Sequence, residues 1–389
     1  MSEVGIERMG FATTGLFLDM RDLAQRRGVD PEKYIIGIGQ SEQSVAPSSQ
    51  DAVTLAAAAA KDALEGEDMD PIDMVLLGTE SGVDASRAGA VYVKELLGLP
   101  DRIRCVEVKQ ACYAATAALS WALDYVSKRP RKKVLVIGSD IARYGLNTPG
   151  EATQGAGAVA MLVSSSPAIL EIEDDGVFLT AEAEDFWRPP YSNCALVDGK
   201  YSTQVYLEFF SRLWKRYREE TGRSIQDFEA FLFHLPFSKM GLKALREALK
   251  EADPDTASML SERFEASAAY SRRVGNIYSG SLYLALLSLL EGEALEAGSR
   301  IALFSYGSGA EAELFSARVK EGYLSRLSPE RHLKMLEGRR KVGIDEYEHL
   351  FSDFPPSSPQ DYVCDKRYFS GPFRFLGVKG QQRMYEADE

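Results

Sequence analysis

Short apolar stretches alternate with longer helical stretches along this chain, and this alternation constrains the fold more than any other feature. In the first half, strand-like runs at 74–79, 133–138 and 158–163 are separated by helical patterns at 84–97 and 112–127. The run at 112–127 is rich in alanine and apolar on nearly every face, as a helix buried between two layers must be. This order predicts β-α-β units in an α/β fold.

The same order of elements recurs in the second half of the chain. We expect a strand at 229–234, a helix at 239–251, a buried helix at 277–290 and strands at 301–306 and 313–319. The correspondence lies in the order of elements rather than in residue identity, and it indicates a duplicated architecture. We therefore predict two pseudo-symmetric halves, residues 1–166 and residues 167–389, the second of which carries a C-terminal extension.

Proline and polar residues mark two irregular segments. Pro189-Pro190 and the polar residues up to Asp198-Gly199 predict a surface crossover, and the prolines at 355, 356 and 359 interrupt the C-terminal region. The aromatic residues that follow predict a closing hairpin at the end of the chain.

Charge and composition limit the classes of ligand. The 389 residues include 58 acidic and 45 basic side chains with a net charge of −13, so the chain as a whole attracts neither nucleic acid nor an anionic membrane surface. An anionic ligand must therefore be held by local basic residues. The N-terminus lacks a basic flank followed by a long apolar run, and no apolar stretch reaches the length of a membrane span. We therefore expect neither a signal peptide nor a membrane span, and a cytoplasmic location.

Cysteine and histidine are scarce in this chain. The four cysteines form no Cys-x-x-Cys pair and the histidines number only three, which argues against a zinc ribbon and against a His-rich metal site. Cys112 lies among small residues at the start of the buried run, where the N–H groups of a helix N-terminus would favour its thiolate. It is therefore a candidate nucleophile, with a place in the core as the alternative. We interpret Cys105, Cys194 and Cys364 as structural.

Superposing the two halves by element order gives two pairs of polar residues at corresponding positions. Glu80 follows the first strand of one half and His234 ends the first strand of the other, while Cys112 and Asn276 stand at the starts of the two buried helices. Open α/β sheets present their sites at such ends. A cysteine nucleophile needs a nearby base, an amide can bind a substrate carbonyl, and burial would raise the pKa of Glu80 into the range useful for proton transfer. Taken singly, a histidine such as His234 in an apolar run is more often a buried packing residue than a functional one. Glu80 taken singly is as often an acidic residue at a helix N-terminus as a catalytic residue.

Two further features indicate substrate binding. The glycine-rich loop at 305–309 can direct backbone N–H groups into a site, as an oxyanion hole requires, although a tight turn is the more common use of such a sequence. Lys239, Lys243, Arg246 and Lys250 recur at helical spacing and thus share one helix face. This basic stripe can hold the phosphates of a nucleotide, or it can be a solvated surface.

Together these motifs resemble the bacterial 3-hydroxy-3-methylglutaryl-coenzyme A (HMG-CoA) synthases, a family of thiolase-fold condensing enzymes. The motifs that carry the resemblance are LLGTESGVDASRA, VKQACYAATAAL, DFWRP, FHLPFSKMG, VGNIYSGSLYLALLSLLE and LFSYGSGAEAE, which are spread over nearly the whole chain. The resemblance implies a thiolase-like fold with five α/β/α/β/α layers. It also implies a homodimer with neither metal nor prosthetic group, which uses acetyl-CoA and acetoacetyl-CoA and serves the mevalonate pathway.

The resemblance also implies a role for each matching residue. Cys112 would take the acetyl group of acetyl-CoA as a thioester, Glu80 would enolise it, and His234 would lie near the acetoacetyl carbonyl. The residues that match substrate or CoA contacts are Asn276 and Ser308 for the substrate, Tyr144, Thr153 and Ser202 for the acyl pocket, and Lys239 and Lys243 for CoA.

Three other functions remain open on this pattern. An initiating ketoacyl synthase uses Cys, His and Asn on the same fold, but it decarboxylates malonyl substrates and needs no carboxylate at the position of Glu80. A polyketide β-branching synthase uses the same residues on carrier-protein substrates. A thiolase-fold dimer that only binds acyl-CoA needs none of Glu80, Cys112 and His234, so their presence favours an acyltransferase.

Overall fold

The first half of the chain forms one side of a large mixed β-sheet in the computed structural model, which describes residues 3–388. Its strands are β1 (Gly5–Thr13), β4 (Ile72–Gly78), β5 (Arg104–Val108), β6 (Lys133–Ala142) and β7 (Gly155–Ser164). They lie in the order β1-β7-β6-β4-β5, with β4 parallel to both β5 and β6 and the other pairs antiparallel. The runs expected to be strands at 74–79, 133–138 and 158–163 are β4, β6 and β7, so this prediction is confirmed.

The second half repeats this arrangement. Its strands are β8 (Leu170–Ile172), β9 (Val177–Thr180), β12 (Ala230–Phe233), β13 (Arg300–Gly307) and β14 (Glu311–Val319). β12 and β13 are parallel and β13 and β14 antiparallel, as β4, β6 and β7 are in the first half. β8 pairs with both β14 and β1, so the strands of the two halves form one ten-stranded sheet.

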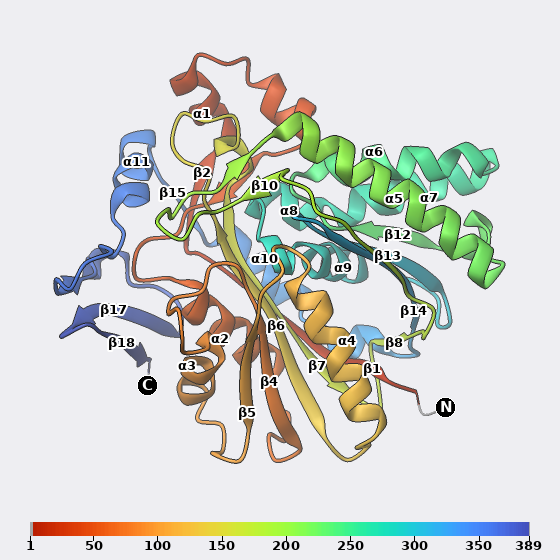
Figure 1. The fold of residues 1–389 in the computed structure, drawn as a ribbon, viewed down its shortest axis with the longest axis horizontal. Helices are drawn as coiled ribbons and strands as arrows, with labels where there is room; N and C mark the ends of the chain where they lie inside the picture. The colour runs from red at the N-terminus through yellow and green to blue at the C-terminus, as the bar shows by residue number, and fades with distance from the viewer. Residues whose placement is uncertain (1–2, 389) are drawn as a thin grey trace.

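Helices cover this sheet and separate its two halves (Figure 1). The helices are α1 (Met20–Arg27), α2 (Ala52–Ala63), α3 (Gly89–Leu96), α4 (Ala114–Ser127), α5 (Gly199–Thr221), α6 (Ser238–Ala248), α7 (Pro254–Ser267), α8 (Ala269–Val274), α9 (Ser281–Gly292), α10 (Pro329–Glu337) and α11 (Ile344–Ser352). Figure 1 shows α5, α6 and α7 on the side of β12 and β13, and α2 and α3 near β4 and β5.

Alternation along the strands explains the layers. Leu77 of β4 packs in the same cluster as the alanines of α2, whereas its neighbour Leu76 packs with α4 and α9. In the second half Phe233 packs with α5 and α6, whereas Leu232 packs with α4 and α9. The predicted five layers are therefore present, with α4 and α9 buried between the two halves of the sheet.

Four of the expected helices have different boundaries. The helix expected at 239–251 ends as α6 at Ala248 and continues as a 3-10 turn over Leu249–Glu251. α3 begins at Gly89 rather than at 84, because the Asp84 carboxylate accepts the N–H groups of residues 86 and 87 and holds a turn there. α4 begins at Ala114 rather than at 112. The buried run expected at 277–290 is divided into a single 3-10 turn, η5 (Tyr278–Gly280), and then α9.

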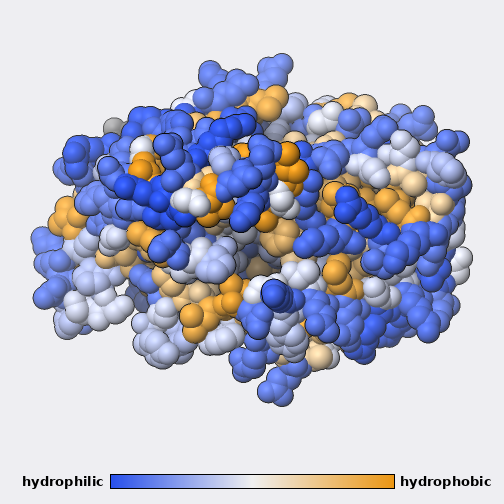
Figure 2. All heavy atoms as spheres, turned by 90° about the horizontal axis from the view of Figure 1, so that it is seen from above, coloured by the Kyte–Doolittle hydropathy of each residue, from blue (hydrophilic) through white to orange (hydrophobic). Residues whose placement is uncertain are grey.

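The remaining segments lie around these layers. The crossover expected at 189–199 follows the short strand β10 (Phe186–Trp187) and contains β11 (Leu196–Val197), which pairs with β10; Asp198 caps α5. The expected closing hairpin is present as β17 (Phe373–Lys379) and β18 (Gln382–Ala387); the other short strands are β2 (Leu16–Asp19), β3 (Glu42–Ser44), β15 (Arg340–Lys341) and β16 (Tyr362–Val363). Seen from above, the surface is mostly hydrophilic, with hydrophobic side chains in small separate groups (Figure 2). No helix among residues 3–388 is long and apolar enough to cross a membrane.

A buried ionic cluster joins the central helix α9 to α2 and α10. His332 of α10 lies 2.8 Å from Asp62 of α2 through Nε2 and 2.8 Å from Glu291 of α9 through Nδ1. Burial alone would lower the pKa of His332, but the bonds to Asp62 and Glu291 raise it to about 9. The imidazole is therefore charged at neutral pH, and this His332 cluster holds α10 against α2 and α9.

Candidate active site

Cys112 lies in a tight turn immediately before α4. An isolated β-bridge pairs Gln110 with Cys112, and the N–H of Tyr113 donates to the carbonyl oxygen of Gln110 at 3.0 Å. Ala111 has a φ of 44° in this turn, a left-handed conformation that is unfavourable for a residue with a Cβ. β13 ends against the turn at Gly307, where a Cβ would stand 2.7 Å from the carbonyl oxygen of Gln110. The second half of the chain thus approaches Cys112 through a position that requires glycine.

The carboxyl group of Glu80 lies beside the thiol of Cys112. Sγ is 3.5 Å from Oε1 of Glu80, which follows the end of β4 and is 7% exposed. Burial, and then the negative charge of Asp140, raise the pKa of Glu80 to about 8. Burial, and then the charge of Glu80, raise the pKa of Cys112 well above its usual range. The expectation that a helix N-terminus would favour the thiolate is therefore wrong for the resting site, because desolvation and neighbouring carboxylates oppose it.

Asp140 positions the segment that carries Glu80. It stands in β6, is fully buried, and accepts the backbone N–H groups of Glu80 and Ser81 at 2.8 and 2.9 Å through Oδ1. The same oxygen accepts the hydroxyl of Thr79, and Oδ2 accepts the N–H of Ser279, in the second half of the chain, at 3.0 Å. Asp140 was not among the residues predicted from the sequence. An acidic residue shortly after the apolar run 133–138 is the signal that could have found it.

His234 directly follows β12 and is held by its backbone. Its N–H donates to the carbonyl oxygen of Phe304, and its own carbonyl oxygen accepts the hydroxyl of Tyr206, both at 2.8 Å. Nδ1 of the imidazole is buried and has no hydrogen-bond partner among the described residues. Burial lowers the pKa of His234 to about 3, so the ring is neutral at pH 7. Because β12 runs parallel to β13, His234 lies at the same edge of the sheet as Gly307 and the Cys112 turn.

Asn276 and Tyr144 form one hydrogen-bonded wall. The side-chain oxygen of Asn276 accepts the N–H of Tyr278 and the hydroxyl of Ser281, both at 2.9 Å, and its Nδ2 donates to the hydroxyl of Tyr144 at 3.4 Å. Tyr144 packs edge to face against Tyr278 and Phe186, with ring centroids 6.0 and 6.1 Å away. Burial raises the pKa of Tyr144, so its hydroxyl stays protonated and can donate to a substrate.

The three remaining hydroxyl residues have different surroundings. The Thr153 hydroxyl donates to a backbone carbonyl of its own turn at 2.8 Å, and the Ser202 hydroxyl donates to Oδ2 of Asp185 at 3.0 Å. Asp185 is fully buried and also accepts the N–H of Gly309, next to Ser308, at 3.0 Å. It therefore joins the start of α5 to the turn between β13 and β14. Asp185 was not predicted as a site residue, although it is the first residue of the motif DFWRP.

The basic stripe is only partly available for a ligand. The side chain of Lys239 packs over Gly39, where an added Cβ would lie 3.1 Å from Cγ of Lys239. Nζ of Lys243 lies 5.4 Å from the centroid of the Phe237 ring. Neither lysine forms an ion pair within residues 3–388, whereas Lys250 pairs with an acidic neighbour at 2.5 Å. The start of α6 is thus the part of the stripe that can hold phosphates. No group of three His, Cys, Asp or Glu side chains that could hold a metal ion occurs within the same residues.

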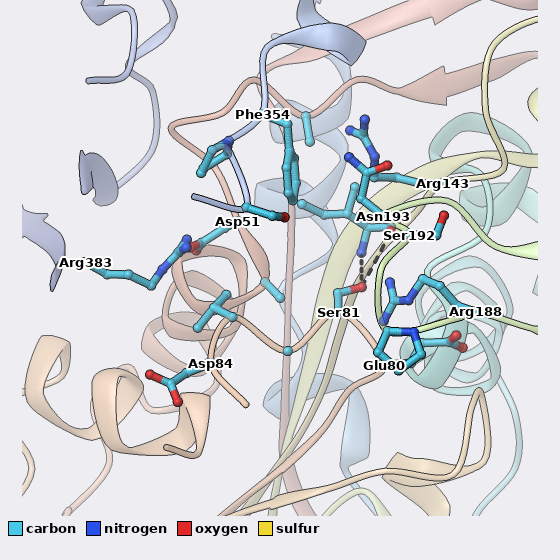
Figure 3. A pocket seen from close by; sticks show the side chains of 18 of the residues that line it. Asp51, Glu80, Ser81, Asp84, Arg143, Arg188, Ser192, Asn193, Phe354 and Arg383 are labelled. Carbon is cyan, nitrogen blue, oxygen red and sulfur yellow. Dashed lines mark hydrogen bonds and ion pairs between the residues drawn. The ribbon is translucent and has the colours of Figure 1, made fainter. Parts of the chain in front are cut away.

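A cavity of about 1400 Å³ opens beside Glu80 (Figure 3). Its wall comes from the segments around Glu80 and before Cys112, from β10 and the residues after it, and from the C-terminal region. Arg188 lies next to Glu80 in this wall, and the two side chains are drawn close together in Figure 3. Burial raises the pKa of Glu80, and the charge of Arg188 lowers it. The cavity therefore reaches Glu80, the neighbour of Cys112, from outside the central layers.

Models of one family match both halves of the chain. The model described as hydroxymethylglutaryl-coenzyme A synthase N terminal matches residues 1–168, and its C-terminal counterpart matches residues 246–351. The hydroxymethylglutaryl-CoA synthase of Enterococcus faecalis is 47% identical over 351 residues, which are 90% of this chain and 92% of that protein. The polyketide biosynthesis 3-hydroxy-3-methylglutaryl-ACP synthase PksG of Bacillus subtilis (strain 168) is 32% identical over 375 residues, 90% of this chain and 88% of that protein.

A solved structure agrees with these matches. A crystal structure of an HMG-CoA synthase complexed with CoA superposes with a TM-score of 0.96 at 44% identity, and the match covers 99% of this chain and 100% of that one. The predicted thiolase-like fold is therefore confirmed. With both halves matched by the family models and with relatives similar over almost their whole length, this chain belongs to the hydroxymethylglutaryl-CoA synthase family.

Proposed function

We propose that this chain is an acyltransferase that condenses acetyl-CoA with acetoacetyl-CoA to give HMG-CoA and CoA. The observation that carries the proposal is the Cys112 thiol at 3.5 Å from the raised-pKa carboxyl of Glu80. A ketoacyl synthase of the initiating type has no use for that carboxyl. The higher identity to a CoA-dependent relative, 47% against 32% for the polyketide enzyme, favours CoA thioesters over carrier-protein substrates.

The reaction begins with acetyl transfer. Sγ of Cys112 attacks the carbonyl carbon of acetyl-CoA, the bond to the CoA sulfur breaks, and the thiol proton of Cys112 passes to the departing CoA sulfur. Lys239 and Lys243 at the start of α6 hold the phosphates of CoA during this step. Tyr144 donates from the aromatic wall, and Thr153, Ser202 and Ser308 complete the surroundings of the acyl group in this proposal.

Condensation follows on the acetylated enzyme. Ionised Glu80 removes a methyl proton from the acetyl group, and the resulting enolate attacks C3 of acetoacetyl-CoA. The N–H of neutral His234 supplies the proton to the developing alkoxide, and the ring regains a proton as Glu80 gives up the one it took from the methyl group. Asn276 orients the carbonyl group. Holding both reactants in one site replaces an encounter in solution and supplies much of the rate. Water then hydrolyses the thioester at Cys112 and releases HMG-CoA.

Replacing Glu80 separates acetylation from condensation. Glu80→Ala should still form acetyl-Cys112 from acetyl-CoA, detected by intact mass, yet lose condensation by a factor of about 10² to 10⁴. Glu208→Ala, an exposed glutamate of α5, is the control and should behave as the unmodified protein. Condensation by Glu80→Ala at the unmodified rate would contradict the proposal. Turnover of malonyl substrates, or of carrier-bound acetoacetyl groups alone, would favour the two other synthases.

The quaternary structure and location are part of the proposal. We propose a homodimer, and β5 supports it, because this strand ends the sheet with an unpaired edge on which Val106 is 45% exposed. Val106→Lys should then dissociate the dimer in light scattering, and an unchanged mass would contradict this interface. We also propose that the enzyme acts in the cytoplasm, in the mevalonate pathway, with no metal or prosthetic group, and that its halves divide at residues 166 and 167.

A further inference from the structure

Arg188 is a cation without a protein partner at the wall of the cavity. It is half-buried after β10 and makes no hydrogen bond or ion pair with any residue from 3 to 388. Other arginines of this cavity are engaged: Arg383 donates to Asp51 at 2.6 Å, and Arg143 donates to a backbone carbonyl oxygen at 2.6 Å. A half-buried guanidinium at a cavity wall that has no partner among these residues is free to bind an anion that enters the cavity.

The position of Arg188 relates this anion to Cys112. The cavity wall includes Arg188, Glu80 and the two residues before Cys112, and Glu80 is itself 3.5 Å from Sγ of Cys112. Figure 3 shows the guanidinium of Arg188 near the carboxyl of Glu80. No residue of α6 lines this cavity, so it reaches Glu80, the neighbour of Cys112, from a surface distinct from the basic stripe.

The chemistry of the proposed reaction identifies which anion appears there. Acetyl-CoA and acetoacetyl-CoA carry no carboxylate at their acyl ends. A carboxylate forms only in the last step, at the carbon atom that was bonded to Sγ of Cys112. Its charge therefore develops beside Glu80, at the end of the cavity where Arg188 lies.

We propose that Arg188 is a catalytic residue for hydrolysis of the HMG thioester, where it binds the carboxylate that this step creates; the inference rests on the proposed roles of Cys112 and Glu80. The oxygen of water bonds to the thioester carbon and the carbon–sulfur bond breaks. One proton of the water passes to the sulfur of Cys112, and the other leaves through Glu80 to solvent as the product ionises. The guanidinium stabilises the oxyanion and then the carboxylate with two parallel N–H groups.

This role predicts which step a substitution slows. An interaction accelerates a step only where it is stronger in that transition state than before it. Loss of Arg188 should therefore slow hydrolysis by about 10²-fold relative to condensation, in line with the loss of one oxyanion donor. The condensed HMG-CoA adduct on Cys112 should then accumulate, because it forms faster than it is released.

The test compares Arg188→Met with Arg188→Lys and with Arg212→Met, which removes an exposed arginine of α5. Each protein is mixed with acetyl-CoA and acetoacetyl-CoA and quenched at successive times, and intact mass gives the fractions of free, acetylated and condensed enzyme. The condensed adduct should dominate for Arg188→Met and be scarce for Arg212→Met. Arg188→Lys, which keeps the charge but not the paired N–H groups, should give an intermediate amount.

Two results would overturn the inference. Arg188→Met could show no condensed adduct at an undiminished overall rate, or it could lose acetylation, condensation and hydrolysis equally, as a variant with a general structural defect does. Failure of the proposed function itself looks different, because the unmodified protein would then release no HMG-CoA from acetyl-CoA and acetoacetyl-CoA, whether or not Cys112 is acetylated. Arg188→Lys separates the charge from folding, since it keeps the long aliphatic stem of the side chain.

Discussion

Condensation should accelerate with pH through about 8, because Glu80 acts as a base only in its ionised form. With a pKa of about 8, about a tenth of Glu80 is ionised at pH 7 and about nine-tenths at pH 9. The rate of carbon–carbon bond formation should therefore rise about tenfold between these two values. A glutamate at the ordinary pKa of 4.5 would already be ionised and would give a flat profile over this range.

A single-turnover assay isolates this step. Acetyl-enzyme is prepared with acetyl-CoA, freed from excess substrate, mixed with saturating acetoacetyl-CoA at pH 6 to 9, and quenched for mass analysis of the adduct. Glu80→Gln should be slow at every pH. Asp140→Asn removes the neighbouring charge that raises the pKa of Glu80, so its profile should move to lower pH. A flat profile for the unmodified enzyme, or a rate that falls as pH rises, would refute the reasoning.

Other changes test the nucleophile, the CoA contacts and the buried ionic cluster. Cys112→Ser should form no acetyl adduct in intact-mass measurement, since a hydroxyl is a far weaker nucleophile than a thiolate. Serine at any of the other three cysteines should leave the adduct in place, and an acetylated Cys112→Ser would contradict the assignment. The double variant Lys239→Ala, Lys243→Ala should raise KM for acetyl-CoA about tenfold. It should raise KM for acetyl-N-acetylcysteamine much less, because that analogue has no nucleotide phosphates. An equal rise in KM for both substrates would show that the basic stripe is only a solvated surface. His332 has a pKa of about 9 in the folded protein and 6.5 when unfolded, so its protonation should stabilise the fold by about 3 kcal/mol below pH 6.5. This contribution is lost as the pH rises through 9. His332→Gln should therefore flatten the pH dependence of the free energy of urea unfolding. A pH dependence between pH 6.5 and 9 that is unchanged in His332→Gln would contradict this account of the cluster.

Much of the fold could be read from the periodicity of the sequence. The apolar runs at 74–79, 133–138 and 158–163 became β4, β6 and β7, because an apolar run of that length satisfies both faces of a buried strand. The alanine-rich run after Cys112 became the buried helix α4 for the same reason. The spacing of apolar residues therefore predicts which strands and helices are buried, and the buried elements form the layers of the fold.

Local pattern was less informative where backbone hydrogen bonds compete. α3 starts later than expected because Asp84 holds a turn, and α4 starts after Cys112 because the chain first forms the turn at Ala111. These competing hydrogen bonds depend on particular side chains and on close contacts such as that of Gly307 with the Cys112 turn. The spacing of apolar residues along the sequence does not predict them.

The sequence by itself indicated which residues are candidates for the chemistry, through motif and element order: Glu80, Cys112, His234 and Asn276 stand at the ends of corresponding elements. Only the tertiary structure decided how they are charged and held. Asp140, Asp185 and Arg188 are far from Cys112 in the sequence, yet they act on the site through buried hydrogen bonds or charge. A pKa depends on desolvation and on charges within a few ångströms, and those distances exist only once the two halves have packed together.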